Sequence, residues 1–69
     1  MHPAVQARLD NLKKRGIFPG EDTGKEFTSG KEVVHEFDYC QMRVSPGAAE
    51  AWCFVDVEHL ERFLRRPGQ

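Results

Sequence analysis

Two cysteines and two histidines, His35, Cys40, Cys53 and His59, are the residues best suited to metal binding or nucleophilic chemistry. They form a nominal Cys₂His₂ set, a donor set found in structural zinc sites. The spacing lacks the closely spaced cysteine pair that such sites use, so two buried thiols and two surface histidines are favoured. A Cys–His nucleophile would need a concave, dry pocket, for which 69 residues leave little room. We therefore expect no catalytic residue, no cofactor and no enzyme activity.

The two cysteines also raise the question of a disulfide. If residues 45–48, Ser-Pro-Gly-Ala, form the turn of a hairpin, Cys40 faces Cys53 across two antiparallel strands. Directly opposed residues lie about 4.5–5.5 Å apart at Cα, which is within bridging range. However, the N-terminus lacks the apolar segment of a signal peptide, which predicts a cytoplasmic protein with free thiols. No basic residue adjoins either cysteine in the sequence, as an activated thiolate would require.

The same hairpin register pairs Arg43 with Glu50 and Met42 with Ala51, and it separates two unlike faces. The small, apolar face is expected to meet the helices and carries Cys40, Met42, Val44, Ala49, Ala51, Cys53 and Val55. The aromatic, charged face has the composition of a protein interface, with contact residues Tyr39, Arg43, Glu50, Trp52 and Phe54. Such aromatics can also stack on unpaired bases. If the N-terminal helix covers this face, it is instead a second core layer, and the sequence favours neither interpretation over the other.

Basic residues at the ends of two predicted helices give a second hypothesis, nucleic-acid binding. If the helix ends converge, a phosphate-contacting patch would contain Lys13, Lys14, Arg15, Arg62, Arg65 and Arg66. The final stretch, AWCFVDVEHLERFLRR, resembles the wing and last helix of small excisionase-like DNA-binding proteins. The resemblance covers about a third of the chain and implies a basic recognition helix at 31–38, where the sequence KEVVHEFD is acidic. The net charge of −1 also disfavours nucleic acid as a partner.

Apolar spacing predicts a helix near each end of the chain to position these residues. The first covers residues 3–15 and ends at Gly16, after which Ile17 and Phe18 are expected to fold back as a plug against the core. The second covers residues 56–66 and is capped by Asp56. Its apolar stripe consists of Val57, Leu60, Phe63 and Leu64.

The chain between the first helix and the hairpin turn is harder to assign. Residues 19–30 are rich in turn formers and predict a loop with at most a short strand near 25–28. Alternating residues over 31–44 favour a strand with a β-bulge near Asp38. A short helix over 30–37, followed by a strand from Tyr39, is the alternative.

These elements predict an α+β fold: an N-terminal helix, a two- or three-stranded antiparallel meander and a C-terminal helix, in one domain of residues 1–69. The chain is 39% hydrophobic, and no apolar run approaches the length of a membrane span, so we expect no membrane contact. The leading function is a small binding or regulatory module that contacts another protein or a second copy of itself. Nucleic-acid binding and a zinc-stabilised domain are the second and third hypotheses.

Overall fold

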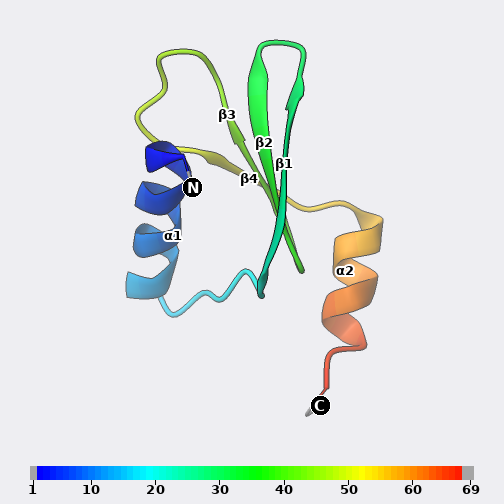
Figure 1. Ribbon diagram of the computed structural model, residues 1–69. Helices are drawn as coiled ribbons and strands as arrows, with labels where there is room; N and C mark the ends of the chain where they lie inside the picture. The colour runs from blue at the N-terminus through cyan, green and yellow to red at the C-terminus, as the bar shows by residue number, and fades with distance from the viewer. Residues whose placement is uncertain (1, 68–69) are drawn as a thin grey trace.

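The chain folds into a four-stranded antiparallel sheet with a helix on either side, as a computed structural model of residues 2–67 shows (Figure 1). The elements are α1 (Pro3–Lys14), β1 (Asp22–Ser29), β2 (Glu32–Phe37), β3 (Gln41–Val44), β4 (Trp52–Phe54) and α2 (Val57–Leu64). The strands pair in chain order, β1-β2-β3-β4. The α+β prediction with a helix near each end is confirmed, but the meander has four strands instead of two or three. Neither described helix has the length and apolar character needed to span a bilayer.

Helix α1 forms the core with one face of the sheet. His2 caps it by accepting a hydrogen bond from Ala4 N at 3.1 Å, and Pro3 occupies the first turn. Gly16 ends it at φ +74, and Ile17 N donates back to Leu12 O at 2.9 Å. This is the Schellman arrangement that glycine permits. The buried core cluster contains Ala4, Val5, Leu12, Phe37, Cys40, Met42, Val44 and Ala51.

Strand β1 is longer than the short strand expected near 25–28. Every one of its eight residues is exposed, so no apolar alternation marks it in the sequence. Backbone pairing with β2 holds it instead, in a register that runs from Ser29↔Glu32 to Asp22↔Phe37. The register shifts between Asp22 and Glu26, so the irregularity in the sheet lies in β1. Asp38 is in a turn outside the strands, and the β-bulge predicted near it is wrong.

Residues 32–37 form a strand, so the alternative helix over 30–37 is wrong. The recognition helix that the excisionase-like resemblance implies at 31–38 is therefore not formed. The chain leaves the sheet after Phe37 in a tight turn, in which Phe37 N donates to Cys40 O at 2.8 Å, and it returns as β3. The turn replaces the continuous bulged strand predicted over 31–44.

The β3–β4 register differs from the predicted one by two residues. Met42 pairs with Cys53 and Arg43 pairs with Trp52, whereas the sequence predicted Met42 opposite Ala51. Helix α1 explains the shift, because Ala51 N donates to Ala4 O at 3.2 Å and draws the chain before β4 away from β3. A shift of two residues preserves the alternation of side chains, so the two predicted faces remain distinct.

Candidate functional site

The predicted aromatic face exists, but only three of its five residues meet on it. Arg43 lies opposite Trp52, and its guanidinium carbon is 5.1 Å from the centre of the Phe54 ring. Trp52 is 69% exposed, so α1 does not cover this face and the second-core-layer interpretation is wrong. We call Arg43, Trp52 and Phe54 the aromatic face.

The other two predicted contact residues, Glu50 and Tyr39, lie elsewhere. The Glu50 carboxylate pairs with Arg8 of α1 at 3.0 Å, instead of with Arg43. The ring of Tyr39 packs edge-on against Phe63 of α2 at 5.4 Å between centroids. Tyr39 therefore joins the sheet to α2 and contributes to a different surface.

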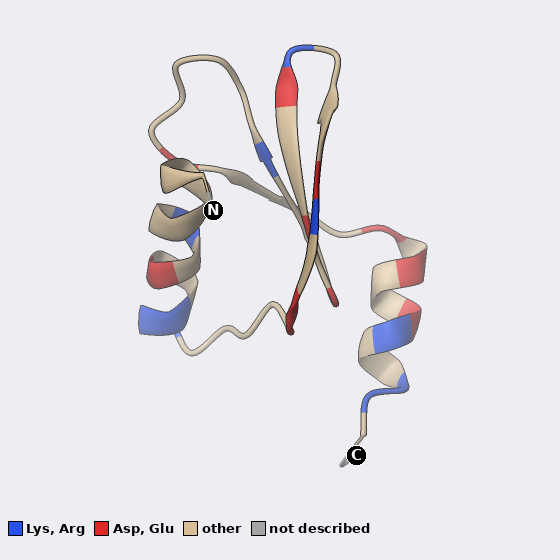
Figure 2. Ribbon diagram, in the orientation of Figure 1, with Lys and Arg blue, Asp and Glu red and all other residues tan. Residues whose placement is uncertain are grey.

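The basic helix ends do not converge. Figure 2 shows the end of α1 that carries Lys13 and Lys14 apart from α2, with the strands drawn between them. On α2, Arg62 lies within 4 Å of the Glu36 and Glu58 carboxylates, and Arg65 lies 3.6 Å from Glu61. Because carboxylates neutralise part of the positive charge, residues 2–67 offer no single phosphate-binding patch of the predicted composition.

The nominal Cys₂His₂ set is also dispersed. His35 Nε2 lies 2.7 Å from Asp22 Oδ1, and His59 Nε2 lies 2.6 Å from Glu36 Oε1. No three histidine, cysteine, aspartate or glutamate side chains in the described part of the chain are placed to share a metal. The predicted burial is confirmed only for Cys40, because both histidines are buried and Cys53 is exposed.

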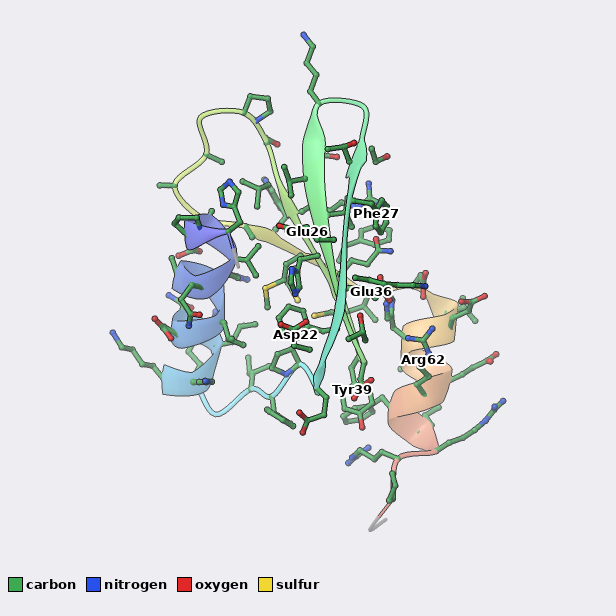
Figure 3. The ribbon with its side chains drawn as sticks, in the orientation of Figure 1. Asp22, Glu26, Phe27, Glu36, Tyr39 and Arg62 are labelled. Carbon is green, nitrogen blue, oxygen red and sulfur yellow. The ribbon has the colours of Figure 1, made fainter. Side chains whose placement is uncertain are left out.

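His59 connects α2 to the sheet through side-chain hydrogen bonds. It forms a capping box with Asp56: His59 N donates to Asp56 Oδ1 at 2.9 Å, and Asp56 N donates to His59 Nδ1 at 3.3 Å. The opposite ring nitrogen contacts Glu36 of β2, and Arg62 points toward the same carboxylate (Figure 3). Both ring nitrogens of His59 are therefore engaged, and neither is free to accept a proton from a cysteine.

Contacts of this kind lower the pKa values of three carboxyl groups, those of Asp22, Glu36 and Asp56. Burial alone would raise the pKa of Glu36, but hydrogen bonds from His59 and Gln41 and the charges of His59 and Arg62 lower it overall. Backbone N–H groups lower the pKa of Asp22 and of Asp56, helped in each case by a histidine. A carboxyl whose pKa is lower in the folded state stabilises the fold fully above its unfolded pKa and loses that contribution as the pH falls.

We therefore expect the free energy of unfolding to decrease as the pH falls below about 4.5, the ordinary pKa of a glutamate. Glu36→Gln, which keeps a hydrogen-bond acceptor for His59, should make this decrease shallower in urea titrations between pH 2 and 7. Glu58→Gln is the control, because that side chain is 81% exposed. Equal pH dependence of the two variants would contradict the assignment of Glu36.

A surface that the sequence did not predict lies between α2 and the segment after α1. A cavity of about 210 Å³ opens there. Its lining is almost entirely apolar or aromatic and consists of Leu12, Ile17, Phe18, Pro19, Tyr39, Cys40, Cys53, Val55, His59, Leu60 and Phe63. A second hollow continues from it, sharing Ile17, Phe18, Tyr39 and Phe63. We call this surface the apolar groove.

Large apolar side chains on both walls of the groove face solvent. Ile17 and Phe18 are 46% and 62% exposed, so the predicted plug against the core is wrong. On the opposite wall Leu60 is 52% exposed, and the remaining apolar residues of α2 are exposed as well. The apolar stripe of α2 was visible in the sequence. The sequence did not show that this stripe is exposed to solvent instead of packed on the sheet.

Two thiols form part of the groove. Cys40 is 2% exposed and Cys53 is exposed, and neither is in a disulfide. A hydrogen bond from Cys40, together with the charges of Arg8 and His59, lowers the pKa of the Cys53 thiol to about 6 against the effect of burial. The same thiol–thiol interaction and burial raise the pKa of Cys40. The two cysteines are thus chemically unequal.

Comparison of the chain with protein-family models, curated proteins and solved structures finds no match.

Proposed function

We propose that this chain is a protein-binding module that associates with a second copy of itself through the apolar groove and the exposed stripe of α2. The observation that carries the proposal is the exposure of large apolar side chains on both groove walls. A contiguous apolar surface of this kind is typical of a protein interaction site.

Helix α2 supports the proposal because it buries little of its surface against the rest of the chain. It has eight residues, too few to be stable alone in water, and His59 is its only buried residue. Val57 and Leu64 are 71% and 68% exposed and lie on the same side of the helix as Leu60. A partner that covers this side would supply the packing that the monomer lacks.

The charge order along α2 favours a second copy as that partner. Asp56 and Glu58 lie at the N-terminal end, and Arg65 and Arg66 follow the C-terminal end. Two α2 helices packed antiparallel about a two-fold axis would place the acidic end of each beside the basic end of the other. Their apolar stripes would then meet, and each stripe would border the groove of the other copy.

The size of the molecule is compatible with such an interface. A standard interface buries about 800 Å² on each partner, which is about a sixth of the 4785 Å² surface of this chain. A chain this short also has a small core, and small domains gain stability from association.

Leu60→Gln is expected to weaken self-association by about 2 kcal/mol, roughly thirtyfold in Kd, because Leu60 lies where the groove meets the stripe. Sedimentation equilibrium over a range of concentrations measures this. Phe27→Gln is the matched control, because Phe27 is similarly exposed at 46% but lies on β1 (Figure 3). A wild-type chain that stays monomeric at high concentration, or equal effects of the two variants, would overturn the proposal.

The aromatic face is the competing contact surface, and Trp52→Ala tests it in the same experiment. Trp52 is 69% exposed, so its truncation should leave the fold intact, which far-UV circular dichroism checks. If Trp52→Ala weakens association and Leu60→Gln does not, the interface is the aromatic face and the groove proposal is wrong.

A further inference from the structure

We propose that Cys53 is a site of reversible oxidation by peroxides, with Cys40 as the resolving thiol that closes an intramolecular disulfide. This inference concerns the chemistry of the groove and does not depend on self-association. It rests on the placement of the two thiols, on the difference in their exposure and on the charged groups around Cys53.

The sheet places both sulfurs on one face. Cys53 pairs with Met42, and Cys40 precedes Met42 by two residues, so the side chains of Cys40 and Cys53 project to the same side. Both side chains line the apolar groove, and the interaction with the other thiol is the largest influence on the pKa of each. Because Cys40 is diagonal to Cys53, and not opposite it as the sequence predicted, a bond between the sulfurs also needs the turn before β3 to move toward β4.

Cys53 also faces another hollow, which contains the Arg8–Glu50 ion pair. This hollow is lined by Arg8 of α1 together with Glu50, Ala51, Trp52 and Cys53. Arg8 donates to Glu50 through one terminal nitrogen, while its Nε is buried without a hydrogen-bond partner in the described part of the chain. The groups facing Cys53 are thus Arg8 from α1, Glu50 from the loop, Cys40 from the β2–β3 turn and His59 from α2.

This environment assigns different roles to the two thiols. Cys53 is exposed, and its lowered pKa makes it a thiolate at neutral pH, which is the nucleophilic form. Cys40 is buried and remains a protonated thiol. A peroxide from solvent can therefore reach Cys53 first, and Cys40 lies beside the product.

The reaction consumes one peroxide and two thiols. The Cys53 thiolate attacks one oxygen of hydrogen peroxide, the O–O bond breaks, and Cys53 sulfenic acid and hydroxide form. The Cys40 sulfur then attacks the Cys53 sulfur, the S–O bond breaks, and the oxygen leaves as water with the Cys40 proton. The hydroxide takes up the proton that Cys53 released on ionisation. The balance is two thiols plus hydrogen peroxide giving one disulfide and two waters.

The full-length reduced chain treated with hydrogen peroxide at pH 7 tests the proposal. Intact mass spectrometry should show the loss of two hydrogens, and peptide mapping should find Cys40 joined to Cys53 in the monomer. Cys40→Ser should instead accumulate a sulfenic acid at Cys53 that dimedone traps. Formation of only intermolecular disulfides, or of sulfinic acid without a disulfide in the wild-type chain, would overturn the proposal.

Alkylation of the unmutated chain, compared with one variant of α1, gives a second test of the roles of the two thiols. Under limiting monobromobimane, Cys53 should react at least about tenfold faster than Cys40, and its rate should reach half-maximum near pH 6 instead of the ordinary 8.5. Arg8→Met should move that midpoint upward. Equal rates at the two cysteines, or a midpoint unaffected by Arg8→Met, would contradict the assigned roles.

Discussion

Gly20→Ala is expected to lower the free energy of unfolding by about 3 kcal/mol, one of the largest effects of any small substitution in this chain. Gly20 has φ +91, a conformation that costs an alanine about 1–2 kcal/mol. A Cβ at this position would lie 2.5 Å from Asp38 Cβ and 2.8 Å from Tyr39 Cδ2. Neither atom is the far end of a flexible side chain, so the turn between β2 and β3 would have to move.

The position of Gly20 links this effect to the groove. Tyr39 N donates to Pro19 O at 3.0 Å, and Glu21 N donates to Asp38 Oδ2 at 3.0 Å. These bonds hold the chain after Phe18 against the β2–β3 turn. An added methyl group would push the two segments apart and displace the wall of the groove that Ile17 and Phe18 form.

Gly24→Ala is the matched control for this prediction. Gly24 has φ +79, but no atom lies within 4 Å of the Cβ that alanine would add. The substitution should therefore show only the conformational cost, about 1 kcal/mol. Urea unfolding of both variants measures the difference in their free energies of unfolding, expected to be about 2 kcal/mol. In thermal unfolding the same difference should separate the two midpoints by about 8–16 °C. Equal destabilisation would mean that the close approach at Gly20 is relieved at little cost.

The sequence predicted the elements that carry a strong local signal. Helix α1 has a helical apolar stripe, a proline in its first turn and a glycine after its end, and α2 has the Asp56 cap. Both were found where expected. The alternation of side chains on β3 and β4 also separated Arg43 and Trp52 from Met42 and Cys53 correctly, since alternation is a local property.

The features that the sequence did not predict depend on contacts between distant segments. The β3–β4 register follows from the Ala51–Ala4 hydrogen bond, and β1 follows from its pairing with β2. Neither leaves a pattern in the residues themselves. The groove could not be predicted because Ile17 and Phe18 are exposed to solvent, whereas large apolar residues are ordinarily expected to be buried.

The second large effect is expected at His59, whose replacement by alanine should detach α2 from the sheet. The substitution removes the only buried side chain of α2, the acceptor for Asp56 N and the partner of Glu36. Loss of one member of a buried pair, with the cavity that follows, costs about 3 kcal/mol. Because α2 has so few other contacts, the loss should appear as local opening of the helix while the sheet persists.

Hydrogen exchange distinguishes this local opening from unfolding of the whole chain. Amides of α2 in His59→Ala should lose roughly a hundredfold in protection, while those of β2 and β3 change far less. His59→Gln should be milder, because glutamine at this position can restore the capping box with Asp56. Uniform loss of protection would show that α2 and the sheet unfold together. If the opening is local, a single histidine determines whether α2 is present as a wall of the groove. Self-association should then decrease in proportion to the fraction of open α2, although the His59 side chain itself is buried.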